Sequence, residues 1–133
     1  PYLDVDELIQ KKTGMAPGEI IAAQGEPAFR DVETVVIRGV AEQNGCVIAT
    51  GGGAILRREN VDLLRRNGRI FFLDRAVEQL IPTEDRPLSS TKEAILKRYD
   101  ERYETYVATA DVVIPNGDTA EAAAQQVKRS FFL

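Results

Sequence analysis

Two closely spaced acids could bind a metal ion and take part in proton transfer. Asp4 and Asp6 are separated by one residue at the end of a short apolar stretch. Alternate residues of an extended strand point to the same side, so the two carboxylates could hold Mg²⁺ and orient a hydroxyl. When the two acids are considered alone, the favoured alternative is that Asp6 caps the helix that follows.

Three consecutive glycines suggest a place where a ligand approaches the backbone. Gly51, Gly52 and Gly53 follow a β-type run that ends at Thr50. Glycines allow close approach and leave amide groups free to bind a ligand. The alternative is a tight turn from strand to helix, although three glycines exceed what a turn needs. No Gly-Lys-Ser/Thr follows, so this segment is not a Walker A loop.

Several arginines could bind an anionic ligand. Arg30 precedes Glu33 by three residues in an amphipathic stretch, and the two could form a surface ion pair or a clamp in which Glu33 supports Arg30. Arg86 lies in a polar stretch and suits charge stabilisation during phosphate transfer, or is exposed to solvent. Arg98 and Arg102 are four residues apart, and most charges of such a helix lie on the surface.

Composition excludes several classes of function. The sequence contains no histidine, which excludes Ser-His and Cys-His nucleophiles and histidine-ligated metals. The single cysteine, Cys46, cannot form an internal disulfide, and we expect a cytoplasmic protein with Cys46 as a small core residue. The net charge of −4 argues against nucleic-acid binding. No apolar run reaches about 18 residues, so we expect no membrane span.

The elements that must position these residues alternate along the chain. Apolar β-type runs predict strands at 1–5, 46–50, 69–74 and 111–115. Helical patterns separate them, at 8–12, 17–23, 29–42, 60–66 (capped by Asn60), 76–81, 90–108 and from 118 onward. Alternation of this kind predicts an α/β domain with a parallel sheet covered on both faces. The continuous apolar runs at 46–50 and 69–74 predict strands that are buried on both faces.

The ordered set of fragments resembles the shikimate kinase family. The matches span residues 2 to 111 and are specific as a set, because each occurs in the expected order. They are Tyr2-Leu3-Asp4-Val5-Asp6, similar to an Asp-x-Asp strand; Gly25-Glu26-Pro27-Ala28-Phe29-Arg30-Asp31-Val32-Glu33, similar to Gly-Glu-x-x-Phe-Arg-x-x-Glu; Val47-Ile48-Ala49-Thr50-Gly51-Gly52-Gly53-Ala54, similar to the triple-glycine strand; Arg86-Pro87-Leu88, similar to the lid motif; and Arg102 with Tyr106, Ala110 and Asp111.

This resemblance implies a fold and a reaction. The fold would be a three-layer α/β/α parallel sheet of the P-loop kinase type, similar to nucleoside-monophosphate kinases. The enzyme would transfer the γ-phosphate of ATP to the 3-hydroxyl of shikimate, giving shikimate 3-phosphate for aromatic amino acid biosynthesis. The expected partners are shikimate and ATP, with Mg²⁺ as cofactor, and neither a nucleic acid nor a membrane.

The resemblance also implies roles for single residues. Asp4 would hold Mg²⁺ through water, and Asp6 would bind the attacking hydroxyl and accept its proton. Arg30 and Arg102 would bind the shikimate carboxylate. Arg86 would close over the phosphates and would be, with Asp6, one of two catalytic residues. The same pocket would be lined by the backbone of Gly51, Gly52 and Gly53.

The sequence departs from the family pattern in two places. A Walker A motif precedes the Asp-x-Asp strand in the family, and nothing precedes Pro1 here. We therefore expect residues 1–133 to form a single, N-terminally incomplete domain without the central P-loop strand, whose P-loop segment lies outside this chain. The alternatives are a truncated shikimate-binding domain that does not transfer phosphate, or a related kinase for another small hydroxylated acid. Pro82 stands where the family has an arginine against the adenine.

Overall fold

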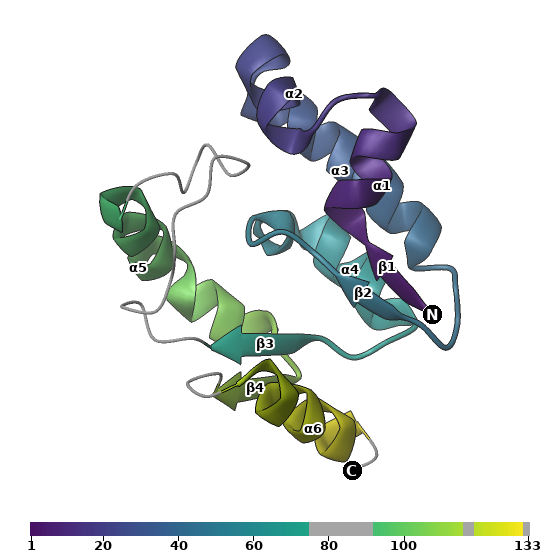
Figure 1. Ribbon diagram of the computed structural model, residues 1–133, viewed down its shortest axis with the longest axis vertical. Coiled ribbons are helices and arrows are strands. Elements are labelled where there is room, and N and C mark those ends of the chain that lie inside the picture. Colours follow the sequence, from purple (N-terminus) through teal and green to yellow (C-terminus); the bar gives the residue numbers. More distant parts are fainter. Residues whose placement is uncertain (75–91, 116–118, 132–133) are drawn as a thin grey trace. The chain divides into compact units, whose positions relative to one another are not determined.

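The computed structural model describes residues 1–74, 92–115 and 119–131 (Figure 1). The chain divides into two compact units, Pro1–Gly68 and Arg69–Leu133. No helix within the described ranges is both long and apolar enough to cross a membrane.

The first unit contains one pair of parallel strands and the helices that follow them. Strand β1 (Tyr2–Asp4) pairs with β2 (Val47–Ala49) in the register Tyr2 to Val47 and Asp4 to Ala49, and the two lie side by side in Figure 1. The helical elements of this unit are α1 (Val5–Thr13), α2 (Pro17–Gln24), α3 (Glu26–Val40), the 3₁₀ helix η1 (Ala54–Leu56) and α4 (Arg58–Arg66).

Local sequence signals explain where the first helices begin and end. Gly14 adopts φ 76° directly after α1, a left-handed conformation that glycine accepts without strain and that ends the helix. Pro17 is placed in the first turn of α2, and Pro27 in the first turn of α3, where a missing backbone N–H costs nothing. The predicted helix at 29–42 therefore starts earlier, at Glu26, and ends earlier, at Val40.

The core of the first unit lies against one face of α3. Apolar side chains from this face pack with those of α1, α2 and α4, and each buried side chain of this size contributes about 1.5–3 kcal/mol to folding. The packing fixes α3, which carries Arg30 and Glu33, relative to α1, which follows β1. The buried apolar residues of this cluster are Val5, Ile9, Ile20, Phe29, Val36, Ile37, Val40, Ala54 and Leu63.

The second unit repeats the strand-helix-strand pattern. Strand β3 (Phe71–Asp74) pairs in parallel with β4 (Val112–Pro115), and α5 (Lys92–Thr109) and α6 (Ala120–Phe131) are its described helices. The ring of Phe72 packs against Tyr106 at 4.9 Å and against Tyr103 at 6.1 Å between centroids. Tyr103 and Tyr106, both half-buried, thus connect α5 to β3 through this ring.

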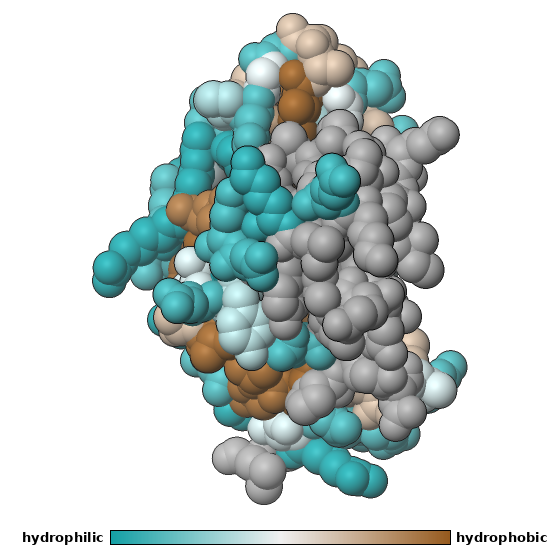
Figure 2. Space-filling model, turned by 90° about the vertical axis from the view of Figure 1, so that its left-hand side faces the viewer, coloured by the Kyte–Doolittle hydropathy of each residue, from teal (hydrophilic) through white to brown (hydrophobic). Residues whose placement is uncertain are grey.

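The four predicted strands and the parallel α/β class are confirmed, but the predicted burial is wrong. Val47 is 66% exposed and Leu73 is 46% exposed, although both belong to runs predicted to be buried on both faces. Each of these strands pairs with only one other strand among the described residues, so each stands at the edge of a two-stranded sheet. Figure 2 accordingly shows apolar side chains at the surface among hydrophilic ones.

The remaining predictions concern helices and their ends. The predicted cap of α4 is wrong: Arg57 precedes the helix, and Asn60 lies inside its first turn with a fully buried side chain. The predicted helix at 76–81 and the predicted start of the helix at 90–108 lie outside the described residues. The last helix begins at Ala120, where the hydroxyl of Thr119 accepts a hydrogen bond from the N–H of Ala122 at 3.1 Å.

Candidate functional site

The two acids near the N-terminus are placed differently from the prediction. Asp4 is the last residue of β1, and its Oδ1 accepts hydrogen bonds from the backbone N–H of Asp6 at 2.9 Å and of Glu7 at 3.3 Å. Asp4 is therefore the N-cap of α1, and the prediction that Asp6 caps the helix is wrong. Asp6 lies in the first turn of α1. The two carboxylates consequently do not share one face of a strand, because the strand ends at Asp4.

The carboxylate of Asp6 approaches the glycine loop, here defined as residues 51–53. A Cβ atom added to Gly51 would lie 3.6 Å from Oδ1 of Asp6 and 3.9 Å from Oε2 of Glu33. One acid comes from α1 and the other from α3, and both reach the segment that follows β2. The fold thus brings the predicted acid Asp6 and the predicted supporting acid Glu33 to the same glycine.

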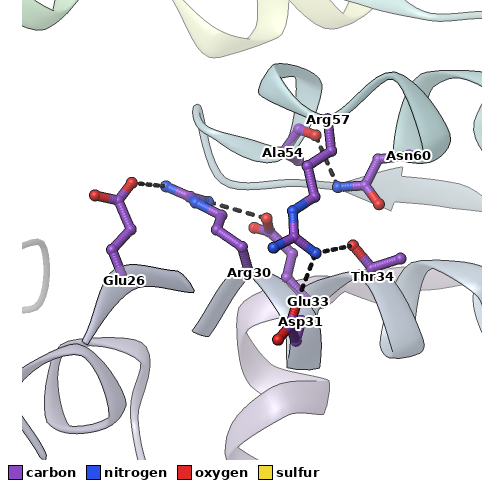
Figure 3. Close-up of polar contacts among 8 residues, drawn as sticks. All are labelled: Glu26, Arg30, Asp31, Glu33, Thr34, Ala54, Arg57 and Asn60. Carbon is purple, nitrogen blue, oxygen red and sulfur yellow. Dashed lines mark hydrogen bonds and ion pairs between the residues drawn. The ribbon is translucent and has the colours of Figure 1, made fainter. Parts of the chain in front are cut away.

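Arg30 is buried and is held by two acids. Its Nη1 donates a hydrogen bond to Oε1 of Glu33 at 2.9 Å, and its Nη2 donates one to Oε1 of Glu26 at 3.2 Å (Figure 3). The Arg30 side chain is only 10% exposed, and its guanidinium carbon lies 4.9 Å from the centre of the Phe29 ring. An exposed surface pair with Glu33, one of the two alternatives, is excluded by this burial.

Glu33 is an acid in a low-dielectric environment. Its side chain is fully buried, and its Oε2 has no hydrogen-bond partner among the residues that the structure describes. Burial raises the pKa of Glu33 above its ordinary value of 4.5 and outweighs the Arg30 guanidinium, which lowers that pKa. The nearby charge of Asp6 raises the pKa of Glu33 further. The acid that orients Arg30 is therefore close to another negative charge.

The glycine loop is not a turn that requires left-handed backbone. Among the described glycines, positive φ angles occur at Gly14, Gly25 and Gly45, and at none of the glycine-loop residues. Gly53 has φ −88° and ψ −3°, values that any residue adopts. Gly52 lies between Gly51 and Gly53 in this segment, and the loop leads directly into η1. The space around the loop, rather than its backbone conformation, explains the glycine at position 53.

Two residues that the sequence did not assign to the site hold the segment after the glycines. Nδ2 of Asn60 donates a hydrogen bond to the carbonyl of Ala54 at 2.8 Å, inside the core. Arg57 forms an ion pair with Asp31 of α3 at 2.8 Å, and its Nη1 lies 3.5 Å from Oγ1 of Thr34 (Figure 3). No spacing in the sequence links Arg57 to α3, because the contact spans more than twenty positions. Asn60 could have been found from the sequence only through its position near the start of the helix predicted at 60–66.

Arg102 belongs to the second unit and is described on its own. It lies on α5 and is 8% exposed. The other charged side chains that the structure describes on this helix are exposed, so the expectation that most of its charges lie on the surface holds there, with Arg102 as the exception. Its Nη2 is buried and has no acceptor within the described ranges. Arg86 and Pro82 lie outside the described residues, so their predicted roles in lid closure and adenine contact remain predictions.

The donor set near Asp4 is compatible with one mode of magnesium binding. No group of three or more His, Cys, Asp or Glu that could hold a metal occurs in the described part of the chain. Mg²⁺ commonly uses one or two carboxylates and fills its other positions with water and substrate phosphates. The capping bonds engage Oδ1 of Asp4, and its carboxylate would hold Mg²⁺ by accepting a hydrogen bond from a metal-bound water rather than as a direct ligand.

Comparison with known proteins connects this geometry to one family. The family model described as shikimate kinase matches residues 1–131. A shikimate kinase of Clostridium botulinum strain Eklund 17B is 35% identical over 132 residues, which are 96% of this chain and 79% of that protein. A shikimate kinase of Clostridium beijerinckii is 38% identical over 119 residues, which are 86% of this chain and 70% of that protein.

Solved structures give the same result. The structure of shikimate kinase from Acinetobacter baumannii in complex with shikimate is 28% identical, with a TM-score of 0.88, and the match covers 97% of this chain and 77% of that one. Shikimate kinase from Aquifex aeolicus is 28% identical, with a TM-score of 0.81, and the match covers 98% and 80%. These matches confirm the P-loop kinase fold. The chain belongs to the shikimate kinase family.

Proposed function

We propose that this protein is a shikimate kinase, which transfers the γ-phosphate of ATP to the 3-hydroxyl of shikimate. One observation carries the proposal. Arg30 Nε and Arg102 Nη2 are buried N–H donors without an acceptor among the described residues, and they belong to the two arginines that the family resemblance assigns to the shikimate carboxylate. A buried, unpaired donor costs about 1–3 kcal/mol, more when charged, and a bound anion would satisfy it. Membership of the family and the shikimate complex of a relative support the same ligand.

Asp6 and Asp4 have separate proposed roles in phosphate transfer. Asp6, whose carboxylate lies near Gly51, would bind the attacking hydroxyl and accept its proton. Asp4 would hold Mg²⁺ through water, and Mg²⁺, when bound with ATP, neutralises charge on the phosphate oxygens during transfer. Arg86 would stabilise the same charge from the lid, as the motif resemblance implies.

Glu26 and Glu33 set the orientation of the arginine. Both carboxylates accept from the terminal nitrogens of Arg30, so the guanidinium cannot rotate freely and its Nε remains available to a ligand. The two acids also offset the positive charge of Arg30, so binding of an anionic ligand would depend on direct charge-assisted hydrogen bonds to the guanidinium. The substrate carboxylate is proposed as that ligand.

Two broader predictions belong with this function. We propose that the two units are parts of one domain, which is supported by a single family match that spans residues 1–131. A cytoplasmic location, expected from the single cysteine, also stays a prediction.

The decisive experiment follows phosphate transfer by the full-length protein. Purified protein is mixed with shikimate and Mg-ATP, and ³¹P NMR identifies the products. We expect shikimate 3-phosphate and an equal amount of ADP, and we expect Asp6→Asn to abolish both without preventing shikimate binding. Tight shikimate binding with no ADP release under any condition would instead favour the non-catalytic alternative.

A substrate panel tests the remaining alternative, a kinase for another small hydroxylated acid. Ring compounds with and without a carboxylate are compared as phosphate acceptors. We expect turnover only for carboxylated rings, because only these use both arginines. Preference for a substrate other than shikimate would overturn the assigned specificity while keeping the kinase activity.

A further inference from the structure

We propose that Gly53 is a positioning residue, whose missing side chain keeps Arg30 in the orientation that binds the substrate carboxylate. This inference rests on the proposed function, but part of its test does not. The prediction from sequence was that Gly53 lines the substrate pocket through its backbone. The geometry points to a second role, in which Gly53 acts through the arginine.

The guanidinium of Arg30 occupies the space that a side chain at position 53 would need. A Cβ atom added to Gly53 would lie 2.1 Å from Nη2, 2.5 Å from Cζ and 2.6 Å from Nη1 of Arg30. Non-bonded carbon atoms prefer separations of about 3.5–4.0 Å, so all three distances are severe overlaps. The three atoms are the centre and both ends of the guanidinium fork, which therefore lies directly against the Gly53 backbone.

Backbone conformation does not explain the glycine. The φ and ψ angles of Gly53, −88° and −3°, are open to alanine. By contrast, Gly14 and Gly25 adopt φ 76° and 91°, where a side chain would be strained. Replacing Gly53 by alanine therefore tests the steric effect of a methyl group on Arg30 without adding backbone strain.

The arginine, rather than the loop, must move when a methyl group is added. The segment after Gly53 is fixed, because the carbonyl of Ala54 accepts from buried Asn60 and Arg57 pairs with Asp31. The guanidinium is the end of a flexible side chain and can swing away. Its displacement breaks the hydrogen bonds to Glu33 and Glu26 and removes it from the site.

Other glycines define the contrast. At Gly51 an added Cβ would lie 3.6 Å from its nearest neighbour, which is ordinary contact. At Gly39, inside α3, no atom beyond its chain neighbours and the nearby backbone of the helix lies within 4 Å of an added Cβ. Gly39→Ala is therefore the matched control, since it makes the same chemical change on the helix that carries Arg30 without touching the site.

The first measurement is shikimate affinity by calorimetry with the full-length protein. We expect Gly53→Ala to weaken binding about tenfold or more, as for the loss of a charged hydrogen bond, and Gly39→Ala to leave it unchanged. In the background of Arg30→Ala, Gly53→Ala should cause no additional loss, because Gly53 acts through the arginine. A further loss of similar size in that background would overturn the proposal.

The second measurement does not depend on any ligand. The carboxyl carbon of Glu33 is followed by ¹³C NMR as the pH is changed. Arg30 lowers the pKa of Glu33, so its displacement in Gly53→Ala should raise that pKa above the wild-type value. An unchanged Glu33 titration in Gly53→Ala would contradict the inference, even if the wild type failed to bind shikimate and the proposed function were wrong.

Folding of the variants provides a last safeguard. If Gly53→Ala lowers the melting temperature or fails to fold, the double variant with Arg30→Ala should recover, because removal of the guanidinium makes room for the methyl group. A double variant that remains as unstable as Gly53→Ala would show that the overlap lies elsewhere, and the proposal would fall.

Discussion

The guanidinium of Arg30 donates a hydrogen bond at 2.9 Å to the fully buried carboxylate of Glu33, one turn further along α3. The acid that holds Arg30, the arginine proposed to bind the substrate, is thus one whose ionisation is disfavoured by burial. The orientation of Arg30 is therefore coupled to the charge of Glu33, and both depend on the packing that buries α3 against α1 and α2.

Protein stability should fall with rising pH because of Glu33. In the unfolded chain its pKa is near 4.5, and in the folded protein burial raises that pKa. Between the two values the folded state binds the proton more strongly, so the free energy of unfolding decreases as pH rises from 4.5 through the raised pKa. Glu33→Gln keeps the acceptor oxygen but does not titrate. The part of the pH dependence of unfolding free energy that comes from Glu33 should therefore be absent in this variant.

Urea unfolding of the wild type and Glu33→Gln at a series of pH values tests this. As pH rises from 4.5, the wild type should lose unfolding free energy relative to Glu33→Gln, because only the wild type carries the titrating acid. A difference that is constant with pH would show that Glu33 titrates normally.

The two acids that hold Arg30 should not be equivalent. Glu33 is fully buried, whereas the side chain of Glu26 is 37% exposed, so water can replace Glu26 more easily. Glu33→Ala should weaken shikimate binding clearly more than Glu26→Ala does, because it leaves the arginine without its buried acceptor. Calorimetric titration of both variants measures this, and a larger effect of Glu26→Ala would reverse the assigned order.

Arg102 should contribute to ligand affinity. Because its buried Nη2 has no acceptor among the described residues, Arg102→Ala should weaken shikimate binding by about 1.5–3 kcal/mol. Lys97→Ala on the same helix is the control, since the Lys97 side chain is exposed and its ion pair with Glu101 is long, at 3.9 Å. Equal affinities for Arg102→Ala and the wild type would remove Arg102 from the site.

Asn60 should stabilise the segment that follows the glycine loop. Asn60→Leu leaves the buried carbonyl of Ala54 without its donor, and we expect a loss of about 1–3 kcal/mol in unfolding free energy. Asp62→Ala on the same helix should change stability by no more than about 0.5 kcal/mol, because its pair with Arg58 is exposed. Thermal and urea unfolding report both, and similar values for the two variants would argue against this role.

Sequence reasoning identified the elements well, because strand and helix signals are local. Gly14 and Pro17 mark real helix ends, and the four β-type runs are the four described strands. Burial was harder to predict. The exposure of Val47 depends on how many neighbours its strand has, and an apolar run looks the same at an edge as in the middle of a sheet.

The site was predicted in part. The spacing of Arg30 and Glu33 left a surface ion pair and an anion clamp open, and the family resemblance supplied the clamp. The bond between the two residues is buried, which excludes the surface pair. Asp4 rather than Asp6 caps α1, because strand β1 ends at Asp4, and composition does not reveal where a strand ends. The contacts of Arg57 and Asn60 connect distant segments and leave no pattern in the sequence.

The central claim is that Arg30 binds the carboxylate of shikimate, and a comparison of shikimate with its methyl ester tests it most directly. The ester keeps the ring and its hydroxyls but carries no charge. In the wild type, shikimate should bind about 10–100-fold more tightly than the ester, and in Arg30→Ala this preference should fall by about tenfold or more. The same preference in both proteins would contradict the account, because the arginine would then not contact the carboxylate.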